Sequence, residues 1–271
     1  MANLALALLL YPGLALVLVL TLVFGWLTEG RVHVGWLRGT VWGSFDALSG
    51  LASVVLAALA LALLPWPLHL DAGWPLVGSP IAIGAALEGA FLLPVLPGLL
   101  ATSPLGQRAA IREAQMSVAG RCVVWLALGA ALWAGAGWAA SAIPGRALVA
   151  LAGLLALPAA IGAGPFGAER SLNAAGAEEG LDEATAALVR FARTARGAAL
   201  LAALIVASVP PGLIQPWIAL LLIGGLFVVI VLLLNRVAGM LPRLTLPAAL
   251  RWCWWRALPL ALVGLVYLIF I

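Results

Sequence analysis

The sequence predicts an all-α integral membrane protein with eight transmembrane helices and a single membrane domain over residues 1–271. Its composition is 65% hydrophobic and 9% charged, whereas a soluble domain is about 25% charged. Eight apolar runs approach the length of about 20 residues that an α-helix needs to cross a bilayer. These runs lie near residues 4–27, 47–65, 79–102, 117–140, 145–165, 190–210, 214–235 and 252–270.

The arginines predict the orientation of these spans. The chain contains no lysine, and every arginine except Arg146 falls in alternate connections or at their edges. Because basic residues near span ends stay on the cytoplasmic side, both termini are predicted to face outward. We therefore expect a multi-pass protein of a bacterial inner membrane. The four predicted cytoplasmic connections hold Arg31 and Arg38; Arg108, Arg112 and Arg121; Arg170, Arg190, Arg193 and Arg196; and Arg236, Arg243, Arg251 and Arg256.

Composition and charge argue against other classes of protein. The net charge of +4 does not indicate nucleic-acid binding, because the arginines are spread over four short connections and form no basic face. The first apolar run has neither a basic start nor a polar cleavage site, so it is predicted to be a retained span and not a signal peptide. The expected surroundings of the helices are membrane lipids.

Two polar segments interrupt the apolar runs. The segment Val32–Phe45 interleaves tryptophans with basic residues and is too polar to span, which predicts a short interfacial helix after the first span. The stretch Gly167–Thr185 is the longest polar one, and Asp182 is predicted to cap a helix that begins at Glu183 and continues into the sixth span. Tryptophans gather near the predicted span ends, as in an aromatic belt.

The sequence shows no self-contained active site or metal site. The stretch Gly162-Ala-Gly164-Pro-Phe-Gly167 matches GxGxxG, but a dinucleotide site needs a preceding strand, so a helix end with close packing is expected instead. His33 and His69 are predicted on opposite sides of the membrane. Cys122 and Cys253 form no CxxC pair and are interpreted as small buried side chains.

Glu88 is the most informative polar residue of the predicted spans. It lies near the middle of the third span, between Gly84 and Gly89 and ahead of Pro94 and Pro97. An ionised carboxylate at that depth is costly unless it is paired, protonated or hydrated. The two prolines free backbone carbonyls and allow a break in the helix. Proton or ion conduction and a purely structural hydrogen bond are both compatible with these observations.

Three stretches near predicted cytoplasmic span ends carry a further pattern. The stretches are Trp26-Leu-Thr-Glu29-Gly-Arg31 with Gly35-Trp-Leu-Arg38 and Asp46-Ala-Leu; Ser103-Pro-Leu-Gly106-Gln-Arg-Ala-Ala-Ile-Arg112-Glu-Ala-Gln115; and Leu246-Pro-Ala-Ala-Leu-Arg251-Trp-Cys-Trp-Trp-Arg256-Ala-Leu-Pro-Leu-Ala-Leu. In order, separation and predicted side they resemble the NuoH family (NADH dehydrogenase subunit 1), the eight-helix membrane subunit of respiratory complex I. A related subunit occurs in the membrane-bound group 4 NiFe hydrogenases.

The resemblance implies a subunit, not catalytic alone, that anchors and couples a redox-driven, ion-translocating oxidoreductase complex. Its implied partners are hydrophilic iron–sulfur subunits on the cytoplasmic side and antiporter-like membrane subunits. Iron–sulfur clusters, and a NiFe centre or quinone, would lie in or beside these partners, with no cofactor or metal bound by this chain. The implied proton or ion relay residues are Glu29, Asp46, Glu178, Glu179, Asp182 and Glu183, together with Glu88.

The connections that contain Gly106–Gln115 and Gly167–Thr185 are expected to contact the soluble partner through complementary charge. The arginines expected to take part in docking are Arg31, Arg38, Arg108, Arg112, Arg170, Arg190 and Arg193.

This chain also departs from the family pattern. Its first cytoplasmic loop is shorter, and the sequence around Gly120-Arg121 replaces a family Ser-Tyr-Glu in the fourth helix. The family's acidic path into the membrane is therefore thinned. Two alternatives stay open: a stand-alone permease or ion-channel module that uses Glu88, and a structural anchor that no longer conducts.

Overall fold

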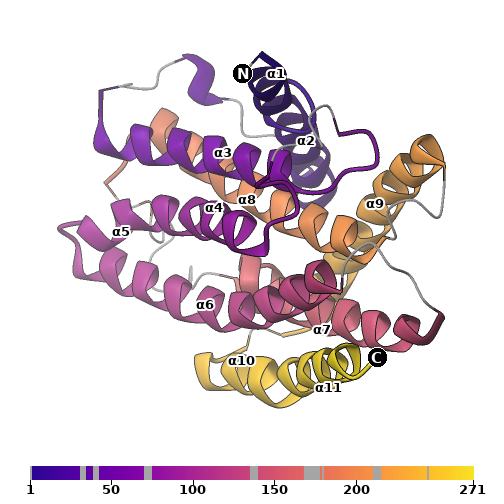
Figure 1. Ribbon diagram of the computed structural model, residues 1–271. Helices are drawn as coiled ribbons and strands as arrows, with labels where there is room; N and C mark the ends of the chain where they lie inside the picture. The colour runs from indigo at the N-terminus through magenta and orange to yellow at the C-terminus, as the bar shows by residue number, and fades with distance from the viewer. Residues whose placement is uncertain are drawn as a thin grey trace.

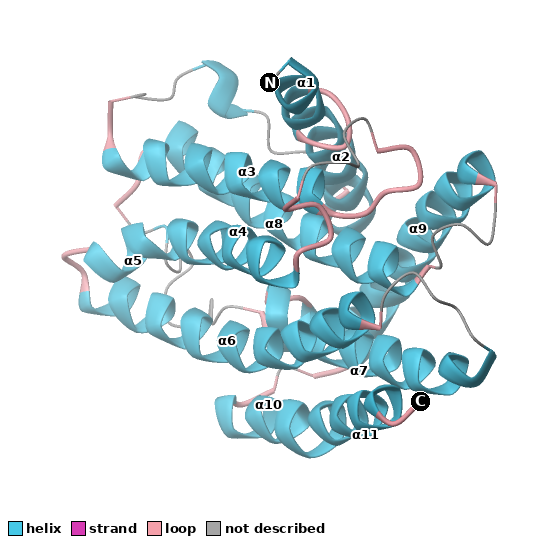
Figure 2. Cartoon of the chain, viewed as in Figure 1, coloured by secondary structure: helices cyan, strands magenta, loops and turns pink. Residues whose placement is uncertain are grey.

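The computed structural model of the chain describes residues 2–30, 35–38, 43–69, 75–134, 140–167, 178, 180–209, 215–242 and 244–271. All secondary structure in these residues is helical (Figure 2). The helices that include the predicted spans are α1 Ala2–Leu9, α2 Leu14–Glu29, α3 Phe45–Leu63, α4 Pro80–Leu92, α5 Leu96–Leu100, α6 Pro104–Trp133, α7 Ile143–Ile161, α8 Glu183–Ser208, α9 Pro216–Met240, α10 Leu246–Trp252 and α11 Leu258–Ile269.

Eight segments are long and apolar enough to cross a membrane, which confirms the predicted number of spans. Short irregular elements complete the fold: 3-10 turns at Gly35–Arg38 (η1), Leu93–Val95 (η2), Ala140–Ala142 (η3) and Gly164–Phe166 (η4), and a π-helical turn at Cys253–Ala257. The turn η1 follows the first span, where a short helix is predicted. The eight spans are Leu6–Glu29, Phe45–Leu63, Pro80–Leu100, Pro104–Trp133, Ile143–Ile161, Glu183–Ser208, Pro216–Met240 and Leu246–Ile269.

Helix α8 is the centre of the bundle. The most apolar part of its span is 83% buried, compared with 22% for the spans that contain α9 and α11. It packs against α2, α3, α4, α6, α7 and α9, and in Figure 1 it passes behind α3 and α4. Alanines and Gly197 supply much of its surface, and small residues let neighbouring helices approach closely in a membrane. Most side chains of α8 therefore lie in the protein interior.

The fourth span differs from its predicted position. It begins at Pro104 and not near residue 117, so the segment Gly106–Gln115 is helical and not a loop. Ser103 caps the helix by accepting a hydrogen bond from the Gly106 N–H, and Pro104 occupies the first turn, where a missing N–H has no cost. Arg121 consequently lies well inside α6 and not at the edge of a connection. Arg196 lies inside α8, in the helix that is predicted to begin at Glu183 and continue into the sixth span.

Other sequence expectations are partly confirmed. Gly162 ends α7 with a positive φ of 69°, so the GxGxxG stretch is a helix end. Gly164 is close-packed as expected, because a Cβ there would lie 2.5 Å from Ala238 Cβ. Cys253 is buried as predicted, but Cys122 is exposed on α6, contrary to the prediction. Among the large exposed tryptophans, Trp26, Trp133 and Trp217 lie near span ends as predicted, whereas Trp254 and Trp255 lie well inside the span Leu246–Ile269.

Helices α6 and α7 touch through backbone at Gly120. A Cβ added there would lie 2.3 Å from the Ala160 nitrogen, so Gly120→Ala must push α7 away. Overpacking of this kind typically costs about 1–3 kcal/mol, and we expect a loss of that size in detergent unfolding of the purified protein. Gly129→Ala on the same helix is the matched control, because a Cβ at Gly129 meets nothing within 4 Å. Equal stability of the two variants would contradict close packing at Gly120.

Candidate functional site

The site begins with the prolines of the third span. A proline has no N–H, so Pro94 cannot donate to the carbonyl of Ala90 in the preceding turn, and the helix passes through η2 before it resumes as α5. The Ser53 hydroxyl of α3 donates to the Ala90 carbonyl at 2.7 Å. The sequence prediction of a break with freed carbonyls is therefore confirmed, and a neighbouring helix uses one of these carbonyls.

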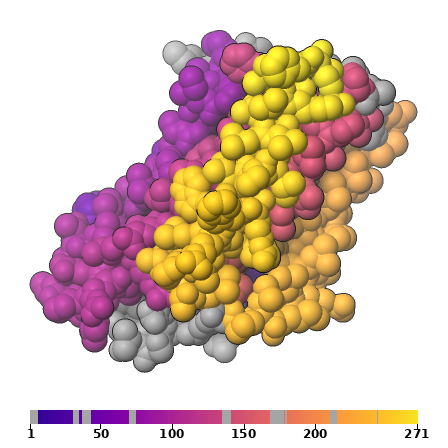
Figure 3. All heavy atoms as spheres, turned by 90° about the horizontal axis from the view of Figure 1, so that it is seen from below, coloured from indigo at the N-terminus to yellow at the C-terminus, as the bar shows by residue number. Residues whose placement is uncertain are grey.

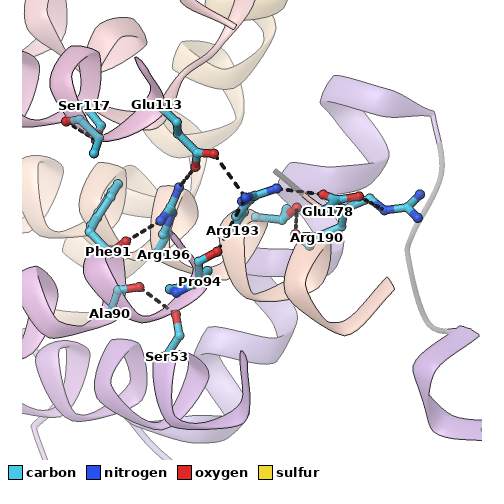
Figure 4. Close-up of polar contacts among 12 residues, drawn as sticks. Ser53, Ala90, Phe91, Pro94, Glu113, Ser117, Glu178, Arg190, Arg193 and Arg196 are labelled. Carbon is cyan, nitrogen blue, oxygen red and sulfur yellow. Dashed lines mark hydrogen bonds and ion pairs between the residues drawn. The ribbon is translucent and has the colours of Figure 1, made fainter. Parts of the chain in front are cut away.

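Two arginines of α8 bind the next carbonyls along the same break. Arg196 Nη1 donates to the Phe91 carbonyl, and Arg193 Nη2 donates to the Pro94 carbonyl at 3.4 Å. Non-helical backbone at membrane depth is tolerated only where protein or a water-filled cavity satisfies it. The prolines of one span and the arginines of another thus form a single structural unit (Figure 4).

Glu113 of α6 holds both of these arginines. Its two carboxylate oxygens lie 2.7 Å from Arg196 Nη2 and 3.0 Å from Arg193 Nη2. The side chains of Arg196 and Glu113 are only 3% and 12% exposed. An ion pair with so little access to water survives only with good geometry and additional hydrogen bonds, which the carbonyls of Phe91 and Pro94 supply.

Glu178 extends this network toward the start of α8. Its carboxylate lies 2.7 Å from Arg193 Nη1 and 3.0 Å from Arg190 Nε. Arg190 is 39% exposed at its side chain, while Glu178 is 15% exposed. The network thus runs from a buried arginine in the bundle to a solvent-accessible arginine near the end of α8 that is predicted to be cytoplasmic.

Glu88 forms a second ion pair, deeper in the bundle. Its Oε2 accepts a hydrogen bond from Arg121 Nε at 2.7 Å, and Arg121 also donates to Ser117 Oγ at 2.7 Å. Arg121 is 2% exposed, but the Glu88 side chain is 38% exposed. The carboxylate is therefore paired with a buried arginine, while part of the Glu88 side chain is open to the surroundings of this chain.

Phe91 connects the two networks. Its ring lies 4.8 Å from the guanidinium carbon of Arg121 and 4.7 Å from that of Arg196, measured to the ring centroid. Each distance is within the range of a cation–π contact, which is strengthened by burial. We name the resulting series the Glu–Arg ladder, and its members are Glu88, Arg121, Phe91, Arg196, Glu113, Arg193, Glu178 and Arg190.

The Glu–Arg ladder unites some of the predicted relay residues and leaves others outside it. Glu88 and Glu178 belong to it. Glu29 is exposed at the end of α2, and Asp46 lies in the first turn of α3, where the helix dipole favours a carboxylate. Glu183 is exposed in the first turn of α8. Glu179 lies outside the described residues.

The predicted docking arginines are used in different ways. Arg190 and Arg193 belong to the ladder, and Arg112 donates to the Leu244 carbonyl at 3.4 Å, so these three guanidiniums bind groups of this chain. Arg108 is exposed on α6. Arg38 ends η1. Arg31 and Arg170 lie outside the described residues.

Sequence reasoning missed Glu113, Arg121 and Arg196 as site residues. One signal was available: Glu113, Ser117 and Arg121 are spaced by four residues and so share one face of a helix. The signal required the helix to start at Pro104, whereas the prediction began the fourth span near residue 117 and left Glu113 in the preceding connection. In the part of the chain that the structure describes, no group of three or more His, Cys, Asp or Glu side chains could hold a metal ion.

Asp182 has a structural role at the end of the ladder. Its carboxylate accepts a hydrogen bond from the Thr185 N–H at 3.0 Å, which confirms the predicted cap of α8. The hydrogen bonds from Thr185 hold the pKa of Asp182 below its usual range. Because the folded-state pKa is depressed, the stabilisation is present above the ordinary pKa of aspartate and is lost as the pH falls through the lowered value.

Replacing Asp182 with Ala is expected to weaken the first turn of α8 by about 1 kcal/mol, the typical cost of losing such a cap. Amide hydrogen exchange should accelerate at the start of α8 and remain unchanged near Leu200, whereas Asp182→Asn, which can still accept the hydrogen bond, should change little. Exchange rates equal to those of the wild type in the Ala variant would show that the cap does not stabilise this turn.

The comparisons with known proteins extend the description of the fold. The sequence matches no family profile and no curated protein. A solved structure does match, at a TM-score of 0.68 over 99% of this chain and 100% of the other, with 16% sequence identity. This chain shares its fold with that chain. The similar chain belongs to the structure of the membrane-bound sulfane sulfur reductase, an archaeal respiratory membrane complex. At this identity the similarity establishes the shared fold.

Proposed function

We propose that this protein is a membrane subunit of a redox-driven, ion-translocating respiratory complex of the cytoplasmic membrane. In this proposal it anchors a hydrophilic iron–sulfur arm and couples it to antiporter-like membrane subunits. The observation that carries the proposal is the Glu–Arg ladder, which joins Glu88 to Glu178 through contacts between α4, α6 and α8. The shared fold with an archaeal respiratory complex and the resemblance to the NuoH family support it.

The ladder offers a physical route for coupling. A change of charge near Glu178 alters the strength of its ion pair with Arg193. Arg193 and Arg196 are in turn both paired with the carboxylate of Glu113. Charges interact strongly where water is excluded. A change in the charge or position of one ion pair of the ladder therefore changes the electric field at the next ion pair. A buried carboxylate responds to such a change, and to altered hydration, by taking up or releasing a proton.

Glu88 is the membrane end of this route. Part of the Glu88 side chain is not buried by this chain. An ionised carboxylate at mid-membrane depth is costly unless it is paired or hydrated. In the proposal, an antiporter-like subunit or confined water covers that side and exchanges protons with Glu88. The pair with Arg121 gives Glu88 a polar neighbour, as a relay requires.

A purely structural role is the second candidate, because every carboxylate of the ladder is paired with an arginine. In this alternative the ladder only fixes α4, α6 and α8 in register. Both candidates predict an anchored complex, and they differ in whether ion translocation depends on the charge of Glu88.

Affinity purification of the tagged full-length protein tests the proposed assembly. An iron–sulfur subunit and an antiporter-like membrane subunit are expected to co-purify. Glu183→Lys together with Arg108→Glu reverses two exposed charges and is expected to weaken attachment of the soluble arm without affecting membrane insertion. Arg236→Glu, which reverses an exposed charge of α9 outside the two segments expected to dock, is the control and should keep the arm attached. Recovery of wild-type protein as a monomer or homo-oligomer would refute the proposed assembly.

A further inference from the structure

The first turns of the eighth span surround a hollow that the proposed function does not use. Its volume is about 570 Å³, and it is lined by Leu244, Thr245, Pro247, Ala248, Arg251, Trp252, Trp255 and Arg256. The two arginines and Trp255 are exposed. Figure 3 shows α10 and α11, in yellow, lying across the outside of the molecule.

The π-helical turn explains why two arginines line the same hollow. Arg251 and Arg256 are five residues apart, and in a regular α-helix this spacing separates side chains by more than a third of a turn. The turn Cys253–Ala257 has wider, i→i+5 winding, with the Leu258 N–H bonded to the Cys253 carbonyl. Since π-helical turns often occur at functional sites, this local widening suggests that the placement of the two guanidiniums serves binding.

One wall of the hollow is fixed by contacts with other helices. The Trp252 indole N–H donates to the Leu155 carbonyl of α7 at 2.9 Å, and its ring packs edge-on against Phe166. The guanidinium carbon of Arg256 lies 4.7 Å from the centroid of the Trp252 ring. Arg256 is therefore positioned on a rigid aromatic platform while its charge remains accessible.

The charge of the hollow is uncompensated within the described part of the chain. Neither Arg251 nor Arg256 forms an ion pair there, in contrast to the paired arginines of the Glu–Arg ladder. The hollow lies along the half of the span Leu246–Ile269 that leads to the predicted cytoplasmic side, and that span is only 22% buried by this chain. Long arginine side chains in this half of a span extend their guanidiniums toward the headgroup level, where tryptophans are enriched.

We propose that this hollow binds the phosphate headgroup of an anionic phospholipid from the cytoplasmic leaflet. The two guanidiniums would donate to the phosphate oxygens, since arginine matches phosphate geometry. Trp255 would lie beside the glycerol region, and the adjoining apolar surface of α11 would contact the acyl chains. Basic pockets on the cytoplasmic side of membrane helices bind anionic headgroups in this manner. The proposal does not depend on the proposed respiratory function.

The test uses the full-length protein with its co-purifying subunits, delipidated in detergent and titrated with phosphatidylglycerol or phosphatidylcholine of equal chain length. Lipid bound to this subunit is counted by native mass spectrometry. We expect clear selectivity for phosphatidylglycerol. The double variant R251Q/R256Q should lower its affinity roughly 30-fold, because each basic residue near a membrane surface contributes about a fivefold factor.

Matched variants make the result specific. R236Q removes an exposed arginine of α9 that forms no ion pair among the described residues, and it should keep wild-type selectivity. If the double variant aggregates, R251Q and R256Q are measured singly, each with an expected fivefold loss. Unchanged selectivity in R251Q/R256Q, or an equal loss in R236Q, overturns the site. If inorganic phosphate binds as tightly as phosphatidylglycerol, the ligand of the hollow is not a lipid. If R251Q/R256Q loses a co-purifying protein subunit but keeps its lipid selectivity, the hollow binds an acidic protein partner instead.

Discussion

Replacing Glu113 with Ala is expected to destabilise the protein by about 3–5 kcal/mol, the cost of removing one partner from a buried ion pair. Glu113 is the shared carboxylate of Arg193 and Arg196, and Arg196 is 3% exposed. Without Glu113, the Arg196 guanidinium keeps its bond to the Phe91 carbonyl but loses its counter-charge. Unfolding in a detergent that preserves the native fold, followed by circular dichroism, measures the loss.

A double variant separates the effect of the charge from that of packing. Glu113→Leu combined with Arg196→Met removes both charges and keeps apolar volume, and such replacements are often neutral or stabilising. We therefore expect the double variant to be more stable than Glu113→Ala. Glu183→Ala is the control, because Glu183 is an exposed carboxylate near the same end of the bundle and should change stability by less than about 0.5 kcal/mol. A Glu113→Ala variant as stable as this control would show that Arg196 does not need its partner.

Glu88→Gln is expected to uncouple ion translocation from electron transfer. The amide keeps the shape of the side chain and an oxygen that can accept from Arg121 Nε, so the complex should assemble and transfer electrons. It cannot carry a proton at physiological pH. The loss of a positioned proton-transfer group typically lowers a rate by about 100-fold or more, and coupled ion flux should fall on that scale.

The measurement compares ions moved per electron in proteoliposomes that contain the purified complex. The structural alternative predicts near-normal coupling for Glu88→Gln and damage only for Glu88→Leu, which leaves Arg121 buried without an acceptor from α4. Glu183→Gln is the matched control and should leave coupling unchanged. Normal coupling in Glu88→Gln together with intact assembly would assign the ladder a structural role.

The sequence alone determined those features of the structure that depend only on residues close together along the chain. Hydropathy is summed along the chain, so the number of spans could be predicted from runs of apolar residues, and eight are present. The missing N–H of Pro94, the cap at Asp182 and the helix end at Gly162 act within one helical turn. The structure confirms each of these local effects.

Only the tertiary structure decided which charges belong to the site. Charged residues lowered the apparent hydropathy before residue 117, and the topology rule assigned Arg121 and Arg196 to the cytoplasmic side. In the structure both side chains are buried and paired, Arg121 with Glu88 and Arg196 with Glu113, whose positions are 33 and 83 residues away in the sequence. The cost of burying an arginine depends on the partner that meets it. That partner is fixed by helix packing across the bundle, which no local window of sequence contains.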